Sequence, residues 1–442
     1  MDPSDGSSNG TADGNRADTR GRIIRSISWL LASRLFNALA SLFYLAAMTR
    51  SLTPTEFGTF AIILATAQLI YGLLDFNTWQ IMVQYGTAHR LRGDRHALGR
   101  LVLFCMCLEG MCGLVAMTVV LVGFGFLADH MGWTGGVATT AFWFIFLFQL
   151  CFRSTASGML RVGEYFGDAA IAEGMMPSLR LVGALSVAFF APSLQNFMIV
   201  WFISEAATAA AHWILALRRF GTPPRENPLT ALREVPKAED KLWHFALITN
   251  LGAVFSTASQ QIVTVSTGVM LGPIAAGLFR IGYQLGQAMA RLVEIISRTL
   301  YTEFSLLWAA GRHDDLRNLL NRTNRIALVS GVILMTVLLL FGRQGIDLFA
   351  GDAYEGAYMI VILMGTAALA ELVCATYQAA LTATRRATTV LIVRTAATAT
   401  LLATLYPLVR HLEADGAAAA ILLSSLVALC GLLIAMRRQA AR

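Results

Sequence analysis

Long apolar runs separated by short polar stretches dominate this chain, and most of them approach the ~20 residues that a helix needs to cross ~30 Å of hydrocarbon. Six runs lie in the first half of the chain and six in the second half. The pattern therefore predicts an all-α integral membrane protein with twelve transmembrane helices. These helices are expected at 27–48, 57–74, 101–121, 137–151, 171–190, 197–217, 245–268, 275–300, 326–341, 357–380, 389–408 and 417–436.

Polar segments divide the chain into lobes. Residues 1–26 carry mostly Gly, Ser, Asp, Asn and Arg before the first apolar run, which predicts a disordered arm. A second polar interval, 218–242, contains four prolines and lies between the two sets of apolar runs. We therefore expect a first lobe at 27–217 and a second lobe at 243–438, joined by this linker.

A short motif occurs twice and relates the two lobes. The pattern L-x-P-x-x-x-G-x-F begins at Leu52 and again at Leu271, 219 positions later, with all four defined residues kept. Internal similarity at a fixed offset near half the chain length is typical of a duplicated membrane bundle. This architecture occurs mostly in secondary transporters, so the repeat favours a transport function.

Composition and charge agree with a membrane protein of defined orientation. Apolar residues make up 56% of the chain, charged residues make up 14%, and the mean hydropathy is +0.61, whereas soluble domains carry about 25% charged residues. Of the 34 Lys and Arg residues, 25 fall in alternate loops and the two termini, which places both termini in the cytoplasm. The net charge of +7 thus reflects topology, and nucleic-acid binding is excluded because no domain presents a basic face.

Polar residues at helical spacing mark faces that must border water or protein rather than lipid. The clearest stripe lies on the helix expected at 275–300, with steps of 4, 3, 4, 3 and 4: Arg280, Gln284, Gln287, Arg291, Glu294 and Arg298. Shorter stripes lie on the first, second and seventh helices: Arg34, Asn37, Ser41 and Tyr44; Gln68, Tyr71, Asp75 and Thr78; Asn250, Thr257, Gln261 and Thr264.

These four helices are equivalent under the repeat, so we expect them to line one central cavity between the lobes. The residues predicted to bind substrate there are Arg34, Asn37, Asp75, Gln261, Arg280, Gln287, Arg291, Glu294 and Arg298. Some Ser, Thr, Asn and Gln side chains could instead join neighbouring helices, at about 0.6 kcal/mol each. An arginine at the centre of a helix costs about 2.5–3.5 kcal/mol, so Arg34 and Arg280 require water or an anionic partner, while Arg298 could reach the cytoplasmic surface.

Other charged and aromatic residues in the apolar runs have structural interpretations. Glu109, Arg180 and Glu205 in the first lobe are expected to form an ion pair, with proton coupling by a carboxylate as the alternative. Arg394 and Glu371 could form a corresponding pair in the second lobe. His212 is expected at the membrane interface, and Trp79, Trp133 and Trp243 are expected to be interface anchors.

Several chemistries are not supported by the sequence. Only two lysines occur, and neither stands in a phosphate-binding loop motif. The longest loop on the side opposite the termini spans only about 342–358, so a catalytic domain has no room there, and no hydrolase motif or metal-ligand spacing occurs. We therefore predict a transporter rather than an enzyme, without a cofactor or a metal site, and driven by an H⁺ or Na⁺ gradient or by the substrate's own gradient.

Three segments resemble a known family. They are 51–76 (SLTPTEFGTFAIILATAQLIYGLLDF), 270–292 (MLGPIAAGLFRIGYQLGQAMARL) and 300–320 (LYTEFSLLWAAGRHDDLRNLL). They are similar to the helix junctions of the polysaccharide and O-antigen (Wzx-type) flippases, within the multidrug/oligosaccharidyl-lipid/polysaccharide (MOP) exporter superfamily. The resemblance implies a MATE-like MOP fold of two six-helix lobes in parallel repeat.

The resemblance also implies a function. Such flippases translocate a polyprenyl-diphosphate-linked oligosaccharide across the bacterial inner membrane by alternating access, for exopolysaccharide, capsule or lipopolysaccharide O-antigen synthesis. Their partners are the lipid bilayer and, in this pathway, a polysaccharide polymerase and glycosyltransferases. Arg34 and Arg280 match helices where these flippases place cavity arginines, which can donate paired hydrogen bonds to a diphosphate. This chain departs from that pattern in its seventh helix, which has Gln260 and Gln261 but no cation.

Two alternatives remain open. A cation-coupled multidrug exporter of the same fold would require an acidic cavity, whereas the stripes and their surroundings hold five basic residues against two acidic ones: Arg34, Arg50, Arg280, Arg291 and Arg298 against Asp75 and Glu294. A non-transporting membrane component of glycan assembly would require catalytic residues in a cleft, and the short loops offer no such set.

Overall fold

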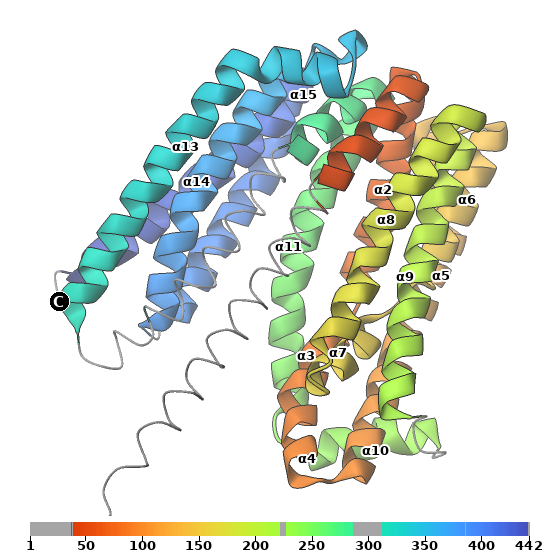
Figure 1. The fold of residues 1–442 in the computed structure, drawn as a ribbon, viewed down its shortest axis with the longest axis vertical. Coiled ribbons are helices and arrows are strands. Elements are labelled where there is room, and N and C mark those ends of the chain that lie inside the picture. Colours follow the sequence, from red (N-terminus) through yellow and green to blue (C-terminus); the bar gives the residue numbers. More distant parts are fainter. Residues whose placement is uncertain are drawn as a thin grey trace, which may run out of the picture.

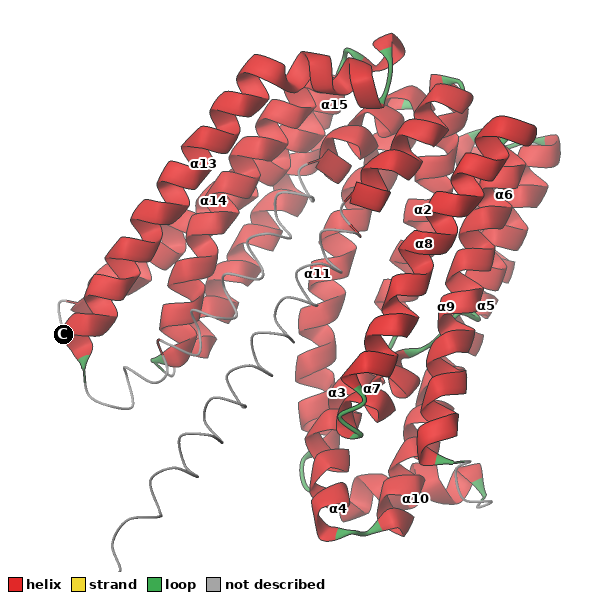
Figure 2. Cartoon of the chain, in the orientation of Figure 1, coloured by secondary structure: helices red, strands yellow, loops and turns green. Residues whose placement is uncertain are grey.

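The computed structural model describes residues 37, 39–221, 227–285, 304, 312–384 and 386–440. Every regular element in these ranges is a helix (Figure 2). Six of the described helices are long and apolar enough to cross a membrane. The protein is thus all-helical with several membrane-spanning helices, whereas the count of twelve and the orientation of the termini stay predictions.

The first group of helices runs from the N-terminal side to α9. Residues 39–51 form a helix. The next helix, α2, begins after Thr53, whose side chain forms a capping box with Glu56. The elements that follow are α2 (Pro54–Leu74), α3 (Thr78–Ile81), a π-helical turn (Met82–Gly86), α4 (Thr87–Arg92), α5 (Arg95–Met131), α6 (Gly135–Phe148), α7 (Ser154–Val162), α8 (Phe166–Phe190) and α9 (Leu194–Phe220). An apolar core around Phe60, Ile63 and Trp201 joins α2, α5, α6, α8 and α9. A second core around Ile81, Met82 and Leu160 joins α3, the π-helical turn and α7 to α5.

The second group comprises α13 (His313–Phe349), α14 (Ala357–Ala383) and α15 (Ala387–Ala440), which pack side by side (Figure 1). The helix at 273–285 belongs to this group as well, because its Phe279 and Tyr283 share an apolar core with α14 and α15. α15 contains two of the expected helices, 389–408 and 417–436. The backbone leaves helical geometry between them at Glu413, where φ is 52°. α11 (Leu242–Leu271) packs against both α2 and α15 and so contacts both groups. Within the linker, α10 (Pro228–Ala238) packs against α5.

Near two of the expected helices the helical segments differ from the sequence prediction. The expected helix 137–151 ends at Phe148, and α7 begins only at Ser154. The expected helix 57–74 does end at Leu74, but the chain resumes helical structure at Thr78 and continues to Arg92. Polar residues stand at both breaks, with Asp75 and Asn77 after α2 and Gln149 and Arg153 after α6.

The two copies of the repeated motif lie against each other. A Cβ on Gly58 would be 1.8 Å from the Pro273 carbonyl oxygen, and a Cβ on Gly277 would be 3.2 Å from the Gly58 Cα. Only glycine permits backbones to approach this closely. Motif positions separated by 219 residues therefore meet, as expected for lobes related by an axis that passes between them.

Further contacts between the groups gather at this same end of the molecule. The Thr49 hydroxyl donates to the Phe349 carbonyl at 3.1 Å, and Arg50 donates to the Leu348 carbonyl at 2.7 Å. The rings of Phe57 and Tyr354 meet edge to face, with centroids 5.8 Å apart. Toward the other end, where α4 and α10 lie, the ribbons of α13 and α14 diverge from those of α8 and α9 (Figure 1). Among the described residues, these contacts join the two groups at the end that the arginine distribution predicts to be non-cytoplasmic.

Candidate functional site

Arg280 lies where the two groups of helices face each other. Arg280 lies about one turn after Gly277 in the helix at 273–285. Because Gly277 packs against Gly58 of α2, this part of the helix lies close to the first group. The Arg280 guanidinium is half-buried and within electrostatic range of Tyr44, Tyr283 and Arg180. Tyr44 and Arg180 belong to the first group, so Arg280 points across the interface.

The surroundings of Arg280 are polar and aromatic. The Tyr44 hydroxyl accepts a hydrogen bond from Gln284 at 3.3 Å, and the Tyr44 ring meets the Trp201 ring edge to face at 5.1 Å. Among the residues that the structure describes, no carboxylate forms an ion pair with Arg280. A guanidinium in this position can form charge-assisted hydrogen bonds with an anionic ligand.

A second arginine in the same region is already paired. Arg180 of α8 donates to Glu205 of α9 at 2.6 Å, and its Nε donates to the Ser204 hydroxyl at 3.2 Å. Arg153 donates to the other Glu205 oxygen at 2.8 Å. The Arg180 guanidinium also lies 5.2 Å from the centre of the Trp201 ring. The predicted ion pair between Arg180 and Glu205 is thus confirmed, with Arg153 as an unforeseen third member.

Glu109 does not join that ion pair, contrary to prediction. Its two carboxylate oxygens accept hydrogen bonds from the backbone N–H groups of Ser154 at 2.7 Å and Thr155 at 3.0 Å. These are the first residues of α7, whose free N–H groups and positive dipole end favour a carboxylate. Glu109 of α5 therefore caps the N-terminus of α7, which begins 45 residues later in the sequence.

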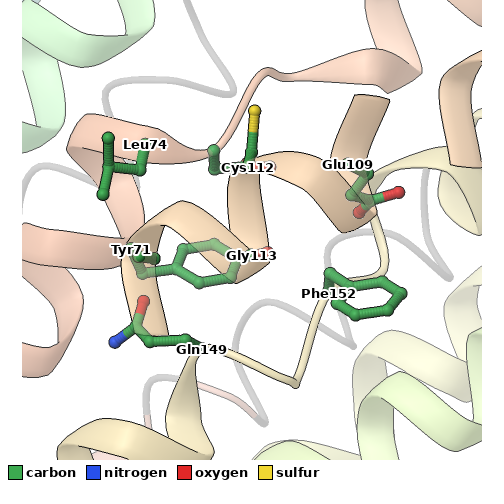
Figure 3. A pocket seen from close by; sticks show the side chains of 9 residues that line it. Tyr71, Leu74, Glu109, Cys112, Gly113, Gln149 and Phe152 are labelled. Atoms are coloured by element: carbon green, nitrogen blue, oxygen red, sulfur yellow. The ribbon is translucent and has the colours of Figure 1, made fainter. Parts of the chain in front are cut away.

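Asp75 lies at the interruption after α2, beside Glu109. It is half-buried and lines a small cavity together with residues of α2, α5 and the segment between α6 and α7. Figure 3 shows several of these side chains, among them Tyr71, Glu109, Cys112 and Gln149. Asp75 thus lies inside the first group.

The remaining predicted site residues have different positions. Asn37 and Gln261 each keep a buried side-chain oxygen without a hydrogen-bond partner in the described structure. Gln261 is on α11, between the two groups, with 9% of its surface exposed. The other five residues lie outside the described ranges: Arg34, Gln287, Arg291, Glu294 and Arg298. The predicted set as a whole stays a prediction.

Other predictions about polar residues have mixed outcomes. The Arg394 and Glu371 pair is confirmed, with two hydrogen bonds of 3.0 and 2.9 Å, and Gln378 also accepts from Arg394. His212 is buried among protein and hydrogen-bonded to the Thr208 carbonyl at 2.9 Å, and its depth in the membrane stays a prediction. Trp133 is likewise buried, in the core of the first group.

The prediction missed Arg153 and Gln149, which the structure places next to the candidate residues. Both lie in the segment between α6 and α7: Gln149 is near the end of the expected helix 137–151, and Arg153 follows that helix by two residues. Four polar residues in the stretch 149–155, namely Gln149, Arg153, Ser154 and Thr155, were the available signal. A membrane helix seldom carries such a cluster unless its backbone is interrupted or its face meets protein.

Comparison with known proteins agrees with this architecture. Residues 23–307 match the sequence model of the family described as "Polysaccharide biosynthesis protein". The inner membrane protein YghQ of Escherichia coli (strain K12) is 27% identical over 351 residues, which cover 77% of this chain and 95% of that protein.

Two solved structures share the fold. A multidrug resistance MATE family transporter of the MOP superfamily, in an inward-facing conformation, aligns with a TM-score of 0.71 and 14% identity over 92% of this chain and 95% of the other. The lipid II flippase MurJ, in an inward closed conformation, aligns with a TM-score of 0.71 and 12% identity over 94% of this chain and 87% of the other. At these identities the likeness concerns the fold alone.

Proposed function

Because this chain belongs to the polysaccharide biosynthesis protein family, we propose that it is a flippase for a polyprenyl-diphosphate-linked oligosaccharide. The lipid-linked glycan would cross the bacterial inner membrane by alternating access and then enter the synthesis of a surface polysaccharide. The protein would exchange this substrate with glycosyltransferases on one side and a polymerase on the other.

The observation that carries this proposal is the position of Arg280. It is half-buried between the two groups of helices, near Arg180, and no described carboxylate pairs with it. A buried arginine without a counter-ion is costly inside a membrane protein. An anionic headgroup would lower that cost, and a diphosphate offers the oxygens to accept two parallel hydrogen bonds from the guanidinium.

The fold supports the same function. MurJ, which shares the fold, is described as a lipid II flippase, and a lipid-linked precursor combines a polar headgroup with a tail that stays in the bilayer. The helix groups contact each other at one end and diverge at the other (Figure 1). This arrangement suits an alternating-access cycle in which a polar headgroup enters from the predicted cytoplasmic side.

Transport by purified protein in liposomes tests the proposal. We expect the wild type to move a fluorescent polyprenyl-diphosphate glycan between leaflets without any sugar nucleotide. Arg280→Ala should reduce the rate at least tenfold, and Arg280→Lys should retain part of it, since lysine keeps the charge but not the paired donors. Arg343→Gln, which removes an arginine that stacks on Tyr358, is the matched control and should transport normally.

The alternatives give different results in the same assay. A multidrug exporter of this fold would expel a cationic dye from the liposomes and would be indifferent to the diphosphate lipid. A non-transporting component of glycan assembly would move neither. Normal transport of the diphosphate lipid by Arg280→Ala would contradict the role assigned to this arginine.

A further inference from the structure

The C-terminal end of α13 lacks hydrogen-bond donors of its own. The carbonyl groups of its last two residues, Leu348 and Phe349, accept no backbone N–H in the part of the chain that the structure describes, because the N–H groups that follow bond to Ile346 and Asp347 instead. The last turn of α13 also contains no basic residue. Free carbonyls and the negative end of the helix dipole therefore require donors or positive charge from another element.

Arg50 of the first group supplies this charge. Its guanidinium donates to the Leu348 carbonyl at 2.7 Å. The Thr49 hydroxyl lies 3.1 Å from the Phe349 carbonyl, but it also lies 3.0 Å from the Leu45 carbonyl of its own helix, so its single proton is shared between them. Because a charged donor forms the stronger hydrogen bond, Arg50 provides the stronger of these two polar links between the groups.

Tyr354 of the second group has the opposite effect at the same end. It belongs to the short 3-10 helix Asp352–Tyr354 after α13 and is 1% exposed, within an apolar cluster that includes Leu52 and Phe57 of the first group. In the described structure, its hydroxyl has no hydrogen-bond partner. A buried hydroxyl without a partner is costly, because it has lost its hydrogen bonds to water. Separation of the two groups at this end would return the hydroxyl to water.

We propose that Arg50 and Tyr354 together set the balance between closed and open forms of this end of the molecule. The bond from Arg50 to α13 favours the closed form, and the unsatisfied Tyr354 hydroxyl favours the open form. Arg50 is exposed, so water replaces the carbonyl when the link breaks and the bond contributes only modestly. Both forms therefore stay accessible. The balance itself is independent of any substrate, and only its use in alternating access rests on the proposed function.

Distances between spin labels on the two groups test this balance without substrate. Gln195→Cys on α9 and His411→Cys on α15 are exposed label positions near this end, in a background without the native cysteines. Arg50→Met keeps the length of the side chain but removes its donors, so the ratio of long to short distances should rise about fivefold, the equivalent of one net hydrogen bond. Arg343→Met removes an arginine that stacks on Tyr358 within the second group and, as the matched control, should leave the ratio unchanged.

Tyr354→Phe keeps the ring and removes the hydroxyl, so it should change the ratio in the opposite direction. In the Arg50→Met background, where the open form is more populated, we expect Tyr354→Phe to lower the ratio about fivefold. Opposite shifts distinguish the proposed balance from general loosening of the structure, which would raise the ratio in both variants. Arg50→Gln replaces Arg50→Met if that variant does not fold.

Two results would overturn the proposal. One is a ratio in the Arg50 variant equal to that of the wild type, because the link to α13 would then not favour the closed form. The other is a ratio that stays the same or rises on Tyr354→Phe, because the hydroxyl would then not favour the open form. Neither measurement requires transport, so the Arg280 experiment stands or fails separately.

Discussion

Glu205 is the residue on which the buried charges of the first group depend. Its carboxylate is only 5% exposed and accepts hydrogen bonds from both Arg153 and Arg180. Removing one partner of a buried ion pair leaves an uncompensated charge, which costs more than the pair itself contributed. Glu205 thus holds Arg180 at the interface near Arg280. It is also the counter-ion of both Arg153 and Arg180.

We expect Glu205→Gln to lower the free energy of unfolding by about 3 kcal/mol, because the buried Arg180 and the half-buried Arg153 then lack their common counter-ion. The comparison is Glu234→Gln, which breaks a pair with Arg100 whose side chains are 53% and 33% exposed and should cost at most about 1 kcal/mol. Melting temperatures of the two variants in the same detergent measure the difference. Equal melting temperatures would show that Glu205 has no such role.

At the scale of elements, helix interruptions and close helix contacts both depend on groups supplied from elsewhere in the chain. Glu109 of α5 satisfies the first N–H groups of α7, and Asn250 of α11 accepts a hydrogen bond from Asn77, beside the α2 interruption, at 3.2 Å. The contact between α2 and the helix at 273–285 depends on two glycines instead. Each of these features joins segments that are distant in sequence.

Gly58→Ala should disturb the contact between the two motifs, since its Cβ would lie 1.8 Å from the Pro273 carbonyl oxygen. The helices must then move apart, so we expect conformations open at this end to become more populated. Spin labels at Thr55→Cys and Glu355→Cys, two exposed positions at this end, should report a longer distance in a background without the native cysteines. Gly123→Ala, where a Cβ meets nothing within 4 Å, should leave the distance unchanged, and an unchanged distance in Gly58→Ala would contradict the prediction.

For the whole molecule, the contacts between the two groups are unevenly distributed. The Thr49, Arg50, Phe57 and Gly58 contacts hold one end together, while α13 and α14 diverge from α8 and α9 toward the end with α4 and α10 (Figure 1). The two solved structures with a TM-score of 0.71 are an inward-facing and an inward closed conformation. Among the described helices, these direct contacts between the two groups therefore lie at the end that the arginine distribution predicts to be non-cytoplasmic.

Chemical labelling of single cysteines tests that orientation. Arg95 is the first residue of α5, directly after the turn that follows α4, and Asp352 lies between α13 and α14 at the opposite end. A membrane-impermeant thiol reagent should label Asp352→Cys in cells whose outer membrane has been permeabilised, whereas Arg95→Cys should react only after the inner membrane is opened. If only Arg95→Cys were labelled after permeabilisation of the outer membrane, the predicted orientation would be wrong and the opposite orientation would hold.

The sequence by itself determined the membrane character, the repeat and the polar face that carries Arg280, because hydropathy and helical spacing are properties of neighbouring residues. It also indicated the Arg180 and Glu205 pair, since a buried charge requires a partner within the same bundle. Only the tertiary structure decided that α6 stops at Phe148, that helical structure resumes at Thr78 after α2, and that Glu109 caps α7 instead of pairing with an arginine. These features depend on groups brought together by packing, and no local pattern encodes which distant side chain satisfies an interrupted backbone.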